Sequence, residues 1–74
     1  MNKARRKQIC EVIKNIEAIQ NILDNILNDE LDAYDSMPEG LQSSENGMTS
    51  EDAQESLEYA INTLEEAIMS LEEI

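Results

Sequence analysis

The 74-residue sequence contains no histidine, tryptophan or phenylalanine, and its only cysteine is Cys10. A single cysteine excludes an internal disulfide, and without histidine or a cysteine pair the usual zinc ligands are missing. With only two glycines the chain has no glycine-rich phosphate loop. The acid-dense segment 28–35 lacks both the spacing and the glycine of an EF-hand calcium loop. We therefore expect no metal ion and no other cofactor.

Carboxyl groups are abundant, but the helical pattern described below places them on solvent-exposed faces. A general acid requires burial to raise its pKa, and Cys10 has no histidine to activate its thiol. We therefore expect a protein that is not an enzyme. A lone cysteine is typical of the reducing cytosol, and no apolar run approaches the roughly 18 residues of a transmembrane helix. The sequence thus predicts a cytoplasmic protein without a membrane partner.

Basic residues are confined to the start of the chain. All five Lys and Arg residues lie within the first 14 positions, where Glu11 is the only acid. The other 16 of the 17 acidic residues occupy the remaining 60 positions, so the net charge of −12 divides into +4 and −16. A body this acidic repels nucleic acid and attracts basic protein surfaces. We expect a basic partner protein and no direct DNA binding.

Two segments carry apolar residues at the alternating three- and four-residue spacing of a coiled coil. The first is rich in β-branched residues and the second alternates leucine with alanine, so large side chains face small ones. Near the end of the first segment the stripe rotates toward Leu27, Leu31 and Tyr34, because a straight helix drifts against a seven-residue repeat. The predicted oligomer seam comprises Ile9, Val12, Ile16, Ile19, Leu23, Ile26, Leu57, Ala60, Ile61, Leu64, Ala67, Ile68 and Leu71.

The sequence predicts an all-α fold, a single domain (1–74) that is an antiparallel, coiled-coil-like helical hairpin. We expect helices over residues 3–35 and 50–74, joined by a loop over 36–49. Pro38 ends the first helix, Asn46-Gly47 is a pair typical of turns, and Thr49 can cap the second helix. Antiparallel pairing lays the basic start beside the acidic end, two regions whose charges each oppose their own helix dipole. The small size and the wide stripes predict a homodimer, forming a four-helix bundle, or a higher homo-oligomer.

The predicted loop is long for a helical hairpin, whose connections usually take about 2–8 residues. Two roles are open for it. Met37, Leu41 and Met48 can fold it over the end of the hairpin as a structural lid. Alternatively, the loop is a recognition element. Its candidate residues are then Met37, Pro38, Glu39, Gly40, Leu41 and Gln42.

The segment Met37-Pro38-Glu39-Gly40-Leu41-Gln42-Ser43-Ser44-Glu45, followed by Leu-Glu-Glu-Ala-Ile repeats, resembles a group of small acidic proteins. These proteins occur in phages and mobile elements of low-GC Gram-positive bacteria. The resemblance covers the loop and the second helix, and it extends to the first helix only by pattern. Members more often carry an arginine before the second glycine of the loop, where this chain has Asn46. The resemblance implies a phage context and assigns neither an activity nor a site.

Three functions are compatible with the sequence. The first is a phage-type inhibitor that mimics nucleic acid, occupying a basic host protein, either nucleic-acid-handling or of a defence system, through an acidic face. That face comprises Glu55, Glu58, Glu65, Glu66, Glu72 and Glu73. The second is a structural or adaptor bundle acting through its apolar seams or through exposed Tyr59 and Met69. The third is an oligomeric sponge for an anionic nucleotide, gripped by a basic arm of Lys3, Arg5, Arg6 and Lys7.

Overall fold

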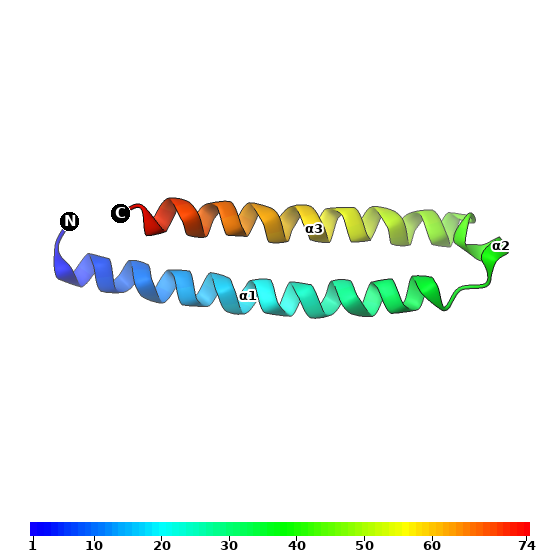
Figure 1. The fold of residues 1–74 in the computed structure, drawn as a ribbon, viewed down its shortest axis with the longest axis horizontal. Helices are drawn as coiled ribbons and strands as arrows, with labels where there is room; N and C mark the ends of the chain where they lie inside the picture. Colours follow the sequence, from blue (N-terminus) through cyan, green and yellow to red (C-terminus); the bar gives the residue numbers. More distant parts are fainter.

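The computed structural model describes all 74 residues and is an antiparallel hairpin of two long helices (Figure 1). Helix α1 spans Lys3–Asp35, helix α3 spans Glu45–Glu72, and the short α2, Glu39–Gln42, lies in the connection. The rod measures 58 × 15 × 12 Å, and both chain termini lie at the same end. The all-helical hairpin predicted from the two apolar seams is confirmed.

Helix α1 has the predicted bounds. Its first turn is capped by Asn2, whose side-chain oxygen accepts a hydrogen bond from the backbone N–H of Arg5 at 2.8 Å. At the other end Ser36 is the C-cap, and Pro38 follows two residues later, where its ring prevents the helix from continuing. Local chemistry alone therefore sets both ends of α1.

Helix α3 begins at Glu45, five residues before the predicted start at 50, and it ends at Glu72. The assignment of Thr49 as its cap was wrong, because the Thr49 hydroxyl lies inside the helix and donates to the Glu45 carbonyl oxygen at 2.9 Å. Ser44 occupies the N-cap position, and its hydroxyl donates to the carbonyl oxygen of Leu41 in α2. The expected turn at Asn46-Gly47 is instead the first turn of α3.

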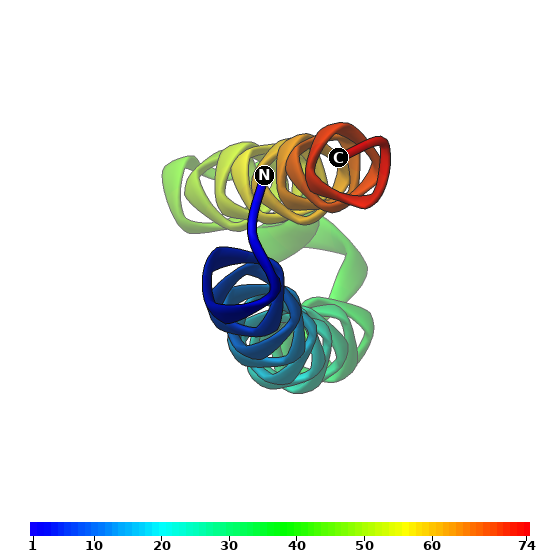
Figure 2. The same ribbon diagram turned by 90° about the vertical axis from the view of Figure 1, so that its left-hand side faces the viewer.

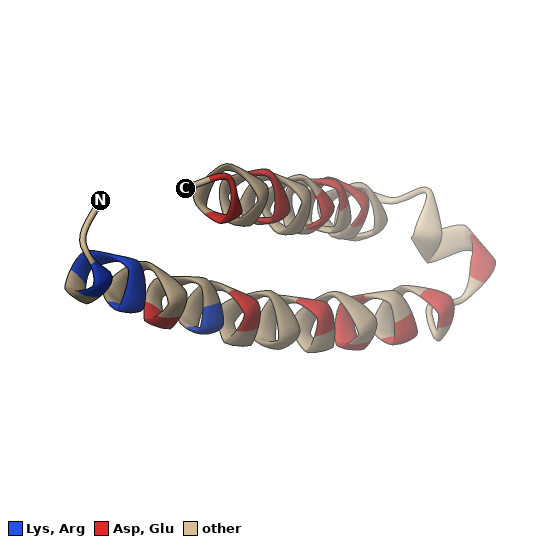
Figure 3. Ribbon diagram, turned by 60° about the vertical axis from the view of Figure 1, so that its left-hand side comes forward, with Lys and Arg blue, Asp and Glu red and all other residues tan.

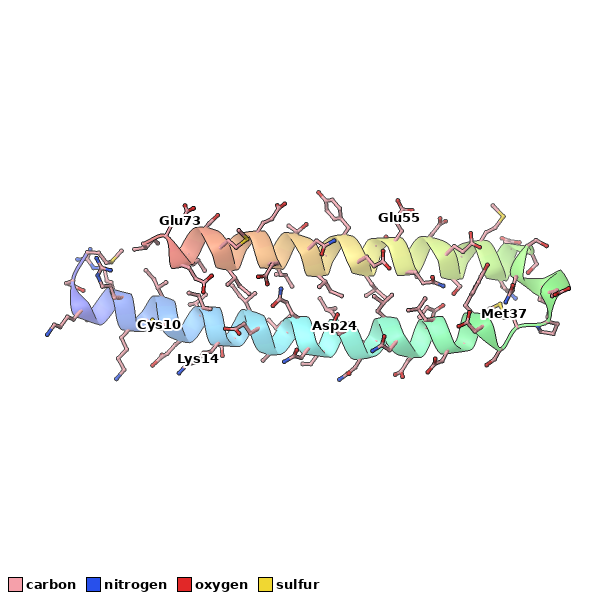
Figure 4. All side chains as sticks on the ribbon, viewed as in Figure 1. Cys10, Lys14, Asp24, Met37, Glu55 and Glu73 are labelled. Atoms are coloured by element: carbon pink, nitrogen blue, oxygen red, sulfur yellow. The ribbon has the colours of Figure 1, made fainter.

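Contacts between the three helices close the loop end of the hairpin. The Gln42 side chain of α2 donates to the Tyr34 carbonyl oxygen at 3.0 Å, and Gly47 is buried beneath α2. Met37 is half-buried and points into the space between the long helices (Figure 4). Leu41 and Met48 are 52 % and 60 % exposed, so they do not cover the end as a lid would require.

The apolar stripe of α3 packs against α1 as predicted, and Ile68, 4 % exposed, is the only buried large apolar side chain. The side of α1 that faces α3 differs from the predicted seam. Val12, Ile19 and Ile26 are 46–47 % exposed and do not face α3. A single partner helix covers one side only, and the side of α1 that it covers includes Leu27, Leu31 and Tyr34. The half-buried residues of α1 are Ile9, Ile13, Ile16, Gln20, Leu23, Leu27, Glu30, Leu31 and Tyr34.

Candidate functional site

Two shallow grooves run along one side of the junction between α1 and α3. The groove at the open end has a volume of about 510 Å³, with Ile13 and Leu71 among its apolar lining. Its polar lining comprises Arg6, Lys14, Glu17 and Glu72. The groove in the middle of the rod has a volume of about 260 Å³ and is lined by Asp24, Leu27, Glu58, Ile61 and Asn62. Both grooves combine apolar residues with charged rims.

Gln20 separates the two grooves. Its side-chain amide donates to the Ile61 carbonyl oxygen at 3.3 Å and to a carboxylate oxygen of Glu65 at 3.0 Å. Gln20 is not among the site residues predicted from the sequence. The available signal was that Gln20 interrupts the seven-residue series that places Ile13 and Leu27 against α3. A polar group in an apolar seam is a known means of fixing helix register, and Gln20 has that position here.

The structure divides the six predicted acidic-face residues into two rows. Glu58, Glu65 and Glu72 form the groove row, since two of them line the grooves and Glu65 binds Gln20 between them. Glu55, Glu66 and Glu73 form the outer row, about a quarter of the helix circumference away. Figure 4 shows Glu55 and Glu73 extending from α3 away from α1. All six side chains are exposed.

The groove row does not stand alone. Glu17 and Asp24 of α1 line the same grooves, so carboxylates from both helices share what we call the acidic groove side. Lys14 is the only basic residue on this side beyond the first turns of α1. Anionic groups on both edges of an apolar floor fit a partner that presents basic and apolar side chains together.

The opposite side of the hairpin carries no charged row. On α1, Val12, Ile19, Ile22 and Ile26 form an apolar stripe about a quarter turn from the side that faces α3. On α3, exposed Ser56, Thr63 and Ser70 lie about half a turn from the groove row. We call these seven residues the uncharged side. The end view shows a single pair of helices, which leaves both sides of the pair uncovered (Figure 2).

The predicted basic arm does not converge into one site. Figure 3 shows that basic residues occur only in the N-terminal part of α1, where the last of them is Lys14, while acidic residues occur along the rest of both long helices. Arg6 donates from its guanidinium to the backbone oxygen of Ile74 at 3.0 Å, so it contacts the end of α3. Lys3 and Lys7 are four residues apart and share one face of the helix, whereas Arg5 lies on a different face. Anion binding by this arm stays a prediction that requires several chains.

The six loop candidates, residues 37–42, lie in the connection between α1 and α3. Hydrogen bonds to the backbone of Tyr34 hold this connection at both of its ends. Tyr34 at the end of α1 donates its hydroxyl to a carboxylate oxygen of Glu51 in α3 at 2.5 Å. This hydrogen bond, supported by burial, raises the pKa of the Tyr34 phenol above its ordinary value of 10.0. Pro38, Glu39, Gly40 and Leu41 are exposed, whereas Gln42 is anchored to the Tyr34 backbone. Of the six loop candidates, the four from Pro38 to Leu41 are thus the most available to a partner.

Three further features bear on function. Tyr59 and Met69 are 74 % and 58 % exposed on α3, as the adaptor hypothesis requires. Cys10 is an exposed free thiol, and no three acidic or thiol side chains lie close enough together to hold a metal ion. None of the helices has an apolar stretch sufficient to cross a lipid bilayer. No protein-family model, curated protein or solved structure matches the chain.

Proposed function

We propose that this protein is a non-enzymatic, phage-type inhibitor that occupies a basic, nucleic-acid-handling or defence protein of the host cytoplasm. The observation that carries the proposal is the segregation of charge: beyond Lys14, 16 acidic residues occupy the chain with no intervening Lys or Arg. Exposed helices usually mix charges of both signs to gain favourable i,i+4 pairs. A chain without those pairs is destabilised by repulsion between its own carboxylates, and a basic partner surface would offset that repulsion.

The acidic groove side is the surface that we assign to this partner. Glu58, Glu65 and Glu72 recur every seven residues, a spacing of about 10.5 Å along the helix axis. Glu17 and Asp24 of α1 add charge across the grooves. Lys and Arg side chains of a nucleic-acid-binding channel, which ordinarily contact phosphates, would meet these carboxylates instead. The apolar residues that line the grooves would add apolar contact with the partner, which the phosphates of a nucleic acid cannot provide.

The same proposal includes a homodimer in the form of a four-helix bundle. Only Ile68 among the large apolar residues is buried, so one hairpin leaves most of its apolar stripe in contact with water. Domains of this size bury a smaller fraction of their surface than larger domains do, and they often depend on association for stability. A dimer would stiffen the rod that presents the acidic groove side.

The test is capture of partners from a lysate of a low-GC Gram-positive bacterium on the immobilised protein. We expect a basic nucleic-acid-handling protein to be retained at 50 mM salt, to be released by 300 mM salt, and to be displaced by duplex DNA or RNA. Contacts between exposed charges weaken over this range because the Debye length shortens. If neither salt nor nucleic acid releases the partner, mimicry is contradicted. The binding surface would then be the exposed loop residues or Tyr59 and Met69.

A further inference from the structure

The α1 part of the uncharged side is an apolar stripe without an intramolecular partner. Val12, Ile19, Ile22 and Ile26 are 46 %, 47 %, 58 % and 47 % exposed, although they recur over about four turns of α1. Scattered exposed apolar residues are ordinary, but a continuous stripe of four marks an interaction surface. Ile16 and Leu23 border the stripe and are themselves only half-buried.

The direction of the stripe agrees with one particular architecture. It lies about a quarter turn from the side of α1 that contacts α3. In a four-helix bundle each helix has two neighbours, at roughly right angles to each other. The stripe therefore points to the position of a second neighbouring helix. On α3 the corresponding positions are Ser56, Thr63 and Ser70, whose small side chains allow a close approach.

The charges of α1 favour one direction for a second α1 helix on this stripe. When Ile19 is placed on a two-fold axis between two antiparallel α1 helices, Val12 of one copy meets Ile26 of the other. The segment 3–14, with five basic residues and one acid, then lies opposite segment 24–35, with five acids and no base. Parallel α1 helices would instead set basic against basic and acidic against acidic. The same two-fold axis at Ile19 therefore pairs the apolar residues with each other and the basic segment with the acidic one.

We infer that the uncharged side docks on a second copy of this chain, with α1 antiparallel to its counterpart about Ile19 and the two loops at opposite ends. The competing face-to-face dimer places α1 on α3 of the second copy, with both loops at one end. That arrangement gathers both basic segments at one end and covers the apolar stripe with Ser and Thr. The inference rests on the homodimer proposed above and specifies its surface and polarity, independently of any basic partner.

The surface is tested with a matched pair of double variants. Ile19→Gln/Ile22→Gln changes the stripe, and Tyr59→Gln/Met69→Gln changes two residues outside it that are at least as exposed. Light scattering at tens of micromolar should give dimers for the wild type and the control, and a monomer for the stripe variant. We expect at least a tenfold weaker self-association, with helical circular dichroism retained at high protein concentration. A monomeric wild type would overturn the dimer, and a stripe variant that stays dimeric would overturn the surface.

Polarity is tested without changing the stripe. Gly40 has open space around it, so a nitroxide on Gly40→Cys in a Cys10→Ser background is sterically tolerated. Pulsed electron spin resonance should give a distance close to the 58 Å length of the hairpin, because the loops lie at opposite ends. A distance within about 30 Å, a few helix spacings, would contradict the antiparallel α1 pair and establish the competing dimer. Neither result depends on capture of a basic host protein.

Discussion

The Cα of Gly47 in α3 lies directly against the backbone of Gln42 in α2. A Cβ atom at position 47 would fall 1.9 Å from the Gln42 carbonyl oxygen and 2.4 Å from its carbonyl carbon. No side chain fits in that space, so glycine is required by close approach and not by a positive φ angle. This contact explains why α3 begins before Gly47 instead of after it.

Gly47→Ala should therefore destabilise the loop end. The added methyl group meets backbone atoms that cannot rotate away, so α2 must separate from α3 at a cost of about 1–3 kcal/mol. Gly40→Ala is the matched control, because nothing lies within 4 Å of its Cβ position. The control should be neutral or stabilising by about 0.4–1 kcal/mol, since alanine lowers the entropy of the unfolded chain. Urea unfolding measures both, and equal stability of the two variants would contradict the contact.

Much of this fold was predictable from the sequence, because local chemistry specifies it. Asn2 and Pro38 bracket α1, and the leucine–alanine stripe identifies the side of α3 that packs. The start of α3 was not predictable, because Asn46-Gly47 has the composition of a turn and only a tertiary contact with Gln42 reveals its role. Local patterns carry no information on that contact.

For the candidate surfaces, too, the residue types were predictable from the sequence, whereas their arrangement depends on tertiary contacts. The six glutamates were evident as an acidic face, but their separation into two rows depends on where α1 lies relative to α3. The rotation of α1 was also beyond the heptad pattern. Both the a/d series containing Val12 and the series containing Ile13 are apolar, and only packing decides between them. Gln20 was missed because its role requires Glu65 and Ile61 of the opposite helix.

Ile68 should be the most sensitive position of the apolar core. Its side chain is 4 % exposed, so Ile68→Ala removes buried methyl groups and leaves a cavity that costs about 2–5 kcal/mol. Met69→Ala, at a neighbouring position that is 58 % exposed, should change the stability by no more than about 0.5 kcal/mol. Urea unfolding at equal protein concentration tests both variants. A similar loss for the two would show that Ile68 is not in the interface between the long helices.

Tyr34 should titrate above its ordinary pKa of 10.0, because the hydrogen bond to Glu51 favours the neutral phenol. A raised pKa in the folded state means that the stabilisation is present below pH 10 and is lost as the pH rises through the folded-state pKa. Tyr59→Phe leaves Tyr34 as the only phenol, so ultraviolet absorbance follows it alone. Adding Glu51→Gln should lower the midpoint. A midpoint at or below 10.0 with Glu51 intact, in a chain that is still helical, would contradict this assignment.

The two glutamate rows provide the most direct test of the proposed function. Glu58→Lys/Glu72→Lys reverses charge on the acidic groove side, and Glu55→Lys/Glu66→Lys reverses the same amount on the outer row. Both pairs leave Glu65 in its hydrogen bond with Gln20, and circular dichroism checks that both variants stay helical. The measurement is the recovery of the captured basic protein at 50 mM salt, quantified by mass spectrometry. The account predicts that the groove-row variant loses the partner and the outer-row variant retains it. Equal recovery by the two variants would contradict it.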